Sequence, residues 1–193
     1  MLVSSRTSSP CCDATKKTKL KEKTKMRRKN KLTLYTTRGA LIAALYVILT
    51  ELATLVGLSS GVIQFRISEA LCILPIFLPE AIPGLFIGCL ISNMLVPGVV
   101  IWDIIFGSLA TLIGAVGARM LRTLPEKYKW VATLPTILAN MIIVPFVLIY
   151  AYGAPDSYLY LAITVGAGEI VCAGIGGSAL YCLLKKYENQ LLR

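Results

Sequence analysis

Four acidic residues and one arginine lie within or beside long apolar stretches of this 193-residue chain: Glu51, Glu69, Asp103, Glu169 and Arg66. A charged side chain placed in a membrane interior costs about 3 kcal/mol on insertion scales, so such residues are functional candidates by default. Carboxylates accept hydrogen bonds and pair with cations, and a guanidinium donates. The set is suited to binding a polar ligand.

Asn93 and Asn140 add amide groups to the same stretches. Structural alternatives remain for several of these residues. Arg66 and Glu69 stand three residues apart and can pair with each other. Asp103 can serve as a helix N-terminal cap, and each asparagine can join two helices by a hydrogen bond.

Glu169 is the strongest candidate. At helical spacing it shares a face with Gly166, Ala173 and Gly177, where small side chains allow close packing. We therefore expect its carboxylate to point into a bundle, toward a ligand or partner.

The composition is typical of a membrane protein. Hydrophobic residues make up 56% of the chain and charged residues 16%, and the mean hydropathy is +0.72. The chain has no histidine, which excludes Ser-His and Cys-His nucleophile pairs and His-ligated metals. We expect no enzyme activity, no metal and no cofactor.

All of the excess positive charge lies near the N-terminus. Residues 1–38 hold twelve Lys/Arg and two acids, while residues 39–193 hold eight of each. Such a segment predicts a disordered basic cytoplasmic tail that contacts anionic lipid rather than nucleic acid. The remaining residues, 39–193, form the predicted transmembrane domain.

The apolar pattern predicts an all-α protein with six transmembrane helices. They are expected near residues 39–58, 67–80, 82–97, 101–121, 130–151 and 157–184. The second and third are short and carry Pro75, Pro79 and Pro83. Because proline releases backbone groups that lipid cannot satisfy, these two should pack centrally or line a pocket.

The basic residues predict the orientation. They cluster before the first helix, between the fourth and fifth (Arg119, Arg122, Lys127, Lys129), and after the sixth. With six spans these clusters share one side, which the positive-inside rule assigns to the cytoplasm, together with both termini. Arg66, Glu69, Asn93, Trp102 and Asp103 then converge on the outer side.

Two further patterns concern partners. Ala40 and Ala44 form a small-xxx-small surface for close helix contact, and Glu51 lies on the same stripe. The chain has no phosphate-binding loop of the G-x-x-x-x-G-K-[ST] type. Uphill transport would need energy from a partner or an ion gradient.

Several segments within residues 33–187 form a specific pattern: 61-GVIQFRISEAL-71, 75-PIFLPEAIPGLFIGCLISN-93, 103-DIIFGSLATL-112, Asn140 and 166-GAGEIV-171. In this pattern the sequence resembles the QueT transporter family. The resemblance implies an S-component, the substrate-binding subunit of an energy-coupling factor (ECF) transporter in the prokaryotic plasma membrane. The implied partners are one T-component, docked through Ala40 and Ala44, and two ATPase subunits.

The implied substrate is a queuosine precursor, queuine or a related 7-deazaguanine. Its guanine-like edge suits a carboxylate of Glu69, Asp103 or Glu169, and its planar base suits stacking on Trp102, Phe65 or Tyr46. Arg66, Asn93 and Asn140 complete the candidate site. The alternatives are an S-component for another vitamin-like molecule, a membrane-embedded enzyme acting on lipid, and a scaffold or channel subunit.

Overall fold

We analysed a computed structural model that describes residues 10–58, 65–96 and 100–187. Every regular element in these residues is a helix, which confirms the all-α class. Four helical stretches are long and apolar enough to cross a membrane: Arg28–Leu55, Ile101–Thr123, Glu126–Tyr150 and Tyr158–Lys185. The two expected Pro-broken helices are shorter, at Ile67–Ile76 and Ala81–Leu95, so the count of six spans stays a prediction.

The chain divides into two units, Met1–Thr37 and Arg38–Arg193. The described part of the first unit differs from the expected disorder, because helix α1 (Pro10–Leu55) begins at Pro10. Its Lys, Leu, Glu and Arg residues have high helix propensity, and extending a helix avoids a new nucleation cost. Residues 1–9 lie outside the described residues.

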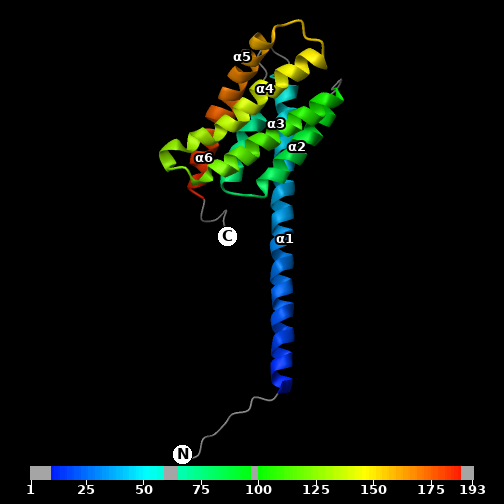
Figure 1. Cartoon of the computed structure of the whole chain (residues 1–193), viewed down its shortest axis with the longest axis vertical. Coiled ribbons are helices and arrows are strands. Elements are labelled where there is room, and N and C mark those ends of the chain that lie inside the picture. The colour runs from blue at the N-terminus through cyan, green and yellow to red at the C-terminus, as the bar shows by residue number, and fades with distance from the viewer. Residues whose placement is uncertain (1–9, 59–64, 97–99, 188–193) are drawn as a thin grey trace, which may run out of the picture. The chain divides into compact units, whose positions relative to one another are not determined.

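Within the second unit, the elements after α1 form a helical bundle (Figure 1). In chain order they are η1 (Ile67–Ile76), α2 (Ala81–Leu95), α3 (Ile101–Met120), η2 (Leu121–Thr123), η3 (Glu126–Thr133), α4 (Leu134–Tyr150), α5 (Tyr158–Glu169), η4 (Ile170–Gly176) and α6 (Gly177–Lys185). Helix α3 packs between α2 and α4, and α4 packs against α5. The last three elements follow one another directly, with η4 forming a π-helical segment between α5 and α6.

The centre of the bundle is η1, a 3₁₀ segment that packs on α2, α3, η4 and α6. Eight of its ten residues are buried, which confirms the expected central position of this Pro-containing segment. Pro79 has no N–H to donate to the carbonyl of Pro75. Instead, Nη1 of Arg119 donates to the carbonyls of Pro75 and Ile76 over 2.9 and 3.1 Å.

Helix α2 packs closely on α1 through small residues. A Cβ placed on Gly84 would lie 2.6 Å from the carbonyl oxygen of Gly39, and one on Gly88 would lie 2.9 Å from that of Ala43. Only glycine permits this approach of the two backbones. The contact fixes Tyr46, one turn further along α1, in the interior.

Candidate functional site

Glu69 sits at the middle of the bundle and is fully buried. Its Oε1 accepts a 2.5 Å hydrogen bond from the hydroxyl of Tyr46 and a 3.0 Å bond from Thr111. Its Oε2 accepts from the thiol of Cys72 over 3.1 Å. Because one turn of 3₁₀ helix spans three residues, η1 places Cys72 over Glu69. The carboxyl therefore joins α1, η1 and α3, and three protein donors already satisfy it.

A second polar group forms a chain of contacts between η1, α2 and α3. Nη2 of Arg66 donates to Oδ1 of Asn93 over 3.3 Å, and Nδ2 of Asn93 donates to the carbonyl of Asp103 over 3.4 Å. Arg66, Asn93 and Asp103 therefore lie together, while their expected position on the outer side of the membrane stays a prediction. A Cβ on Gly107 would lie 2.9 Å from Nδ2 of Asn93, so glycine leaves the room for this amide.

Arg66 and Asp103 make other contacts than the ion pair and the helix cap that their spacing in the sequence allowed. Arg66 donates to Asn93, and the structure shows no ion pair between it and Glu69 within the described ranges. Val100 holds the N-cap position of α3, and Oδ2 of Asp103 accepts a 3.1 Å hydrogen bond from the hydroxyl of Tyr152. Partial burial raises the pKa of Tyr152 above its ordinary value, so its hydroxyl stays protonated and able to donate.

Glu169 and Asn140 form a different kind of group, because three of their buried polar atoms make no well-aligned hydrogen bond to the described residues. Glu169 is 4% exposed and Asn140 is 0% exposed. Oε2 of Glu169, both amide atoms of Asn140 and Nη1 of Arg66 are buried with no hydrogen-bond partner among the described residues. The Asn140 amide lies within hydrogen-bonding range of the Glu169 carboxyl without making a well-aligned hydrogen bond to it, and Arg66 acts on the same carboxyl through its charge. Buried polar atoms are normally satisfied, so this group requires a ligand or water to complete it.

The backbone also changes at this point. Helix α5 ends at Glu169, and the π-helical η4 begins at Ile170. Such π segments inside helices are rare and frequently mark functional sites. A carboxylate acceptor, an amide with donor and acceptor, and a guanidinium donor can together bind a planar ligand that presents both N–H and C=O groups on its edge.

Comparison with known proteins identifies the family to which the chain belongs. Residues 36–186 match the QueT transporter family over most of the chain. The chain belongs to this family. It is also similar to the Queuosine precursor transporter QueT of Lactococcus lactis subsp. cremoris (strain MG1363), with 42% identity over 93 residues. That alignment covers 47% of this chain and 53% of the relative, so it spans about half of the relative's length. No solved structure matches the chain.

Membership of the QueT transporter family and the four long apolar helices together identify a membrane protein. The matched residues include all of the candidate site. No group of three or more His, Cys, Asp or Glu side chains is placed to hold a metal within the part of the chain that the structure describes.

Some of the side chains predicted to form the site of this QueT family member do not contact its buried carboxylates. Trp102 is 52% exposed and stacks on Phe106 at 6.0 Å between ring centroids. It precedes Thr111 by nine residues, so it points about 180° away from the Glu69 contact on the same helix. Phe65 is half-buried, and its backbone N–H donates to the carbonyl of Leu58.

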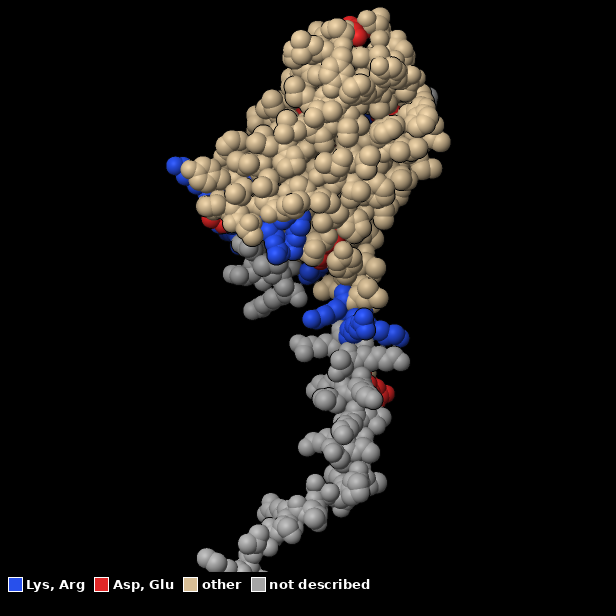
Figure 2. Space-filling model, in the orientation of Figure 1, with Lys and Arg blue, Asp and Glu red and all other residues tan. Residues whose placement is uncertain are grey.

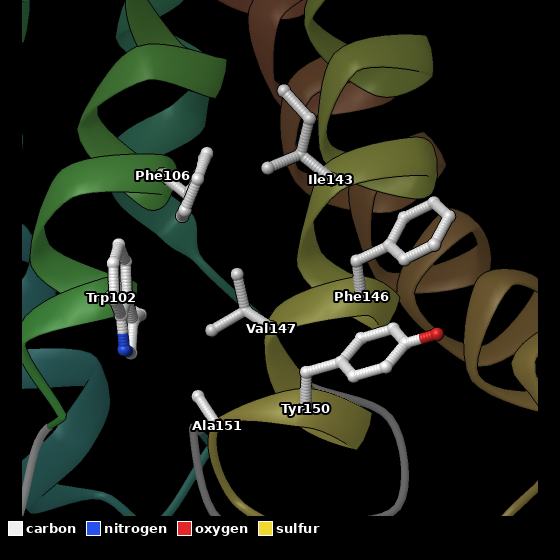
Figure 3. Close-up of a pocket in the computed structure, with 7 residues that line it drawn as sticks. All are labelled: Trp102, Phe106, Ile143, Phe146, Val147, Tyr150 and Ala151. Atoms are coloured by element: carbon white, nitrogen blue, oxygen red, sulfur yellow. The ribbon is translucent and has the colours of Figure 1, made fainter.

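Trp102 instead lines an apolar cavity of about 390 Å³. Figure 3 shows Trp102 and Phe106, from α3, facing Ile143 and Val147 of α4, while the rings of Phe146 and Tyr150 extend away from α3. The lining carries no carboxylate. The structure therefore separates the aromatic cavity from the buried polar group.

Sequence reasoning missed the partners of Glu69. Thr111 and Cys72 read as ordinary residues of apolar helices, and Tyr46 was expected only as a stacking surface. A weak signal existed, because Tyr46 is an aromatic residue with a polar end in an otherwise aliphatic segment, and buried tyrosine hydroxyls usually find a partner. No comparable feature of the sequence indicated that Tyr152, in the loop after α4, would donate to Asp103.

Proposed function

We propose that this chain is the substrate-binding S-component of an ECF transporter and captures a queuosine precursor, queuine or a related 7-deazaguanine. The proposal rests on one observation above all: the unpartnered polar atoms of Glu169, Asn140 and Arg66 in the interior of a QueT family member. The similar Lactococcus protein bears the name of a queuosine precursor transporter, which supports the substrate class.

The available atoms match a guanine-like edge. Such an edge presents neighbouring N–H donors and a carbonyl oxygen. Oε2 of Glu169 can accept the N–H groups, while the amide nitrogen of Asn140 or Nη1 of Arg66 can donate to the carbonyl. Charge-assisted hydrogen bonds of this kind are the stronger ones, and they favour a ligand with two parallel donors.

The remaining candidates take supporting roles in the proposal. Glu69 holds α1, η1 and α3 in place around the ligand, since its oxygens already accept three hydrogen bonds. Asp103 is partly exposed and is the carboxylate we assign to an aminomethyl cation on the ligand. Asn93 keeps the Arg66 guanidinium oriented toward the site.

Uptake is powered, in this proposal, by a T-component and two ATPase subunits. Ala40 and Ala44 are exposed, whereas Ala43 on the neighbouring face is buried against α2. The exposed alanines leave a shallow surface that another transmembrane helix can approach closely. Glu51 is half-buried, so it only partly shares that surface. Both termini are placed in the cytoplasm on the basis of the basic clusters.

A thermal-shift series tests the substrate. The purified chain is heated alone and with queuine, its 7-aminomethyl relative, riboflavin, thiamine or biotin. A ligand present at 100 times its Kd stabilises by about 2.7 kcal/mol. We expect stabilisation by a 7-deazaguanine, and less than about 1 kcal/mol of stabilisation by the same ligand in the Glu169→Gln variant. Stabilisation by one of the other vitamins alone would assign the chain to a different substrate class.

A further inference from the structure

A second cavity of about 430 Å³ lies between η3 and α6. Its lining includes Glu126 beside Lys127, Lys129, Trp130, Tyr181 and Lys185. The cavity is separate from the polar group at Glu169, and no role in substrate capture falls to it. Three lysines, one carboxylate and two aromatic side chains therefore meet in one recess.

The cavity lies at the level where candidate membrane spans end. One span begins at Glu126, a second ends at Lys185, and a third ends at Thr123. The ends of spans coincide with the lipid headgroup region, where tryptophan and tyrosine are enriched. Trp130 is 55% exposed and Tyr128 is 48% exposed here. Figure 2 shows Lys and Arg gathered toward one end of the membrane unit, while uncharged residues cover most of the remaining visible face.

The charge around the cavity is unbalanced. Residues 119–130 and 178–187 contain six cationic side chains and one acid, Glu126. Oε2 of Glu126 already accepts from Lys185 over 2.6 Å and from Tyr181 over 2.9 Å. Lys129 donates to the backbone carbonyl of Arg122 and lies close enough to Glu126 to interact with its charge, but it makes no direct ion pair with a carboxylate among the described residues. The ammonium of Lys127 lies 5.9 Å from the ring centre of Tyr128 and is likewise free of a carboxylate among the described residues.

We propose that this cavity binds the phosphate of an anionic phospholipid headgroup, with Lys127 and Lys129 as its cationic ligands. The long lysine stems cover apolar surface while their ammonium groups reach the phosphate. Basic recesses between transmembrane helices are suited to anionic headgroups. Trp130 then lies at the level of the glycerol backbone, with its ring against the upper acyl chains.

The test counts lipids bound to the full-length chain in detergent by native mass spectrometry, during titration with phosphatidylglycerol or phosphatidylcholine. We expect retained phosphatidylglycerol and little phosphatidylcholine. Loss of two lysine contacts, in Lys127→Gln/Lys129→Gln, should weaken phosphatidylglycerol binding about 10- to 30-fold. The matched control is Lys186→Gln, which removes one charge just outside the cavity and should bind within about twofold of the parent.

Three outcomes would overturn the assignment. They are equal retention of both lipids, unchanged phosphatidylglycerol binding in the double variant, and displacement of the lipid by millimolar inorganic phosphate, which would indicate a site for free phosphate. Loss of uptake in the double variant with lipid binding intact would assign the surface to an acidic partner protein instead. Should the double variant fail to fold, Lys127→Gln alone carries the test, because this side chain is exposed.

Discussion

The hydroxyl of Tyr46 donates to Oε1 of Glu69 over 2.5 Å, with both side chains buried and 23 residues apart in the chain. This hydrogen bond fastens α1 to the central segment η1. It also occupies an oxygen that a ligand would otherwise use. Both oxygens of Glu69 are therefore engaged within the protein, whereas Oε2 of Glu169 is buried without a well-aligned hydrogen bond among the described residues.

Tyr46→Phe should lower the stability of the membrane domain. The change removes one donor from a buried carboxyl and leaves the ring in place, at an expected loss of about 1–3 kcal/mol. Chemical unfolding of the purified chain in detergent measures this difference. Tyr160→Phe, at a side chain that is 46% exposed, is the matched control and should be neutral. Equal stability of Tyr46→Phe and the parent would mean that the hydrogen bond contributes nothing.

Glu169→Gln and Glu69→Gln should separate binding from stability. At Glu169 the amide turns an acceptor into a donor that faces the ligand's N–H groups, so the Kd should rise about 30- to 1,000-fold, or roughly 2–4 kcal/mol. At Glu69 the same change disturbs the donors of Tyr46 and Thr111, so the melting temperature should fall first. Ligand titration and melting of both variants in nanodiscs provide the comparison. Parent-like binding by both folded variants would place recognition elsewhere.

Ala40→Leu and Ala44→Leu should reduce uptake without reducing ligand binding. Both positions are exposed, so a larger side chain displaces a partner helix and leaves the interior unchanged. Uptake in cells with the full transporter, set beside ligand binding to the isolated chain, measures the difference. Ala43→Leu provides the contrast, since Ala43 is buried against Gly88 and should lose folding and binding together. Loss of binding by the isolated Ala40→Leu chain would contradict the docking role.

Arg119→Met should destabilise the bundle. The substitution keeps an apolar stem and removes the donor that serves the carbonyls of Pro75 and Ile76, and leaving buried carbonyls unsatisfied costs about 1–3 kcal/mol. Arg122→Met is the control, because it removes the same charge from an exposed side chain. The comparison is made by thermal unfolding. Equal losses of thermal stability in the two variants would mean that Arg119 contributes through its charge and not through its hydrogen bonds to the two carbonyls.

Gly84→Ala should also destabilise the protein. The new Cβ would meet the backbone carbonyl of Gly39 at 2.6 Å, and a backbone atom cannot rotate away as a side chain can. Overpacking of this kind costs about 1–3 kcal/mol. At Gly174 a Cβ would lie 3.6 Å from Ile137, an ordinary contact, so Gly174→Ala should be tolerated. A parent-like melting temperature for Gly84→Ala would show that α1 and α2 separate at little cost.

The sequence predicted the positions of the helices along the chain. Hydropathy located each expected helix, because burial in a membrane requires long apolar stretches, and the prolines of η1 indicated a segment that had to pack inside protein. Small residues beside Glu169 predicted its buried face correctly. The helical start of α1 at Pro10 was not predicted, since charge pattern alone does not exclude a solvated helix.

The sequence by itself determined which residues share a face of each helix, because helical periodicity fixes their spacing around the axis. Only the tertiary structure decided which helices become neighbours. Thr111 lies 42 residues from Glu69 and became its donor because α3 packs on η1. The same packing turned Trp102 away from the carboxylates. It also placed Asn140 of α4 beside the Glu169 carboxyl and left Oε2 of Glu169 without a well-aligned hydrogen bond among the described residues.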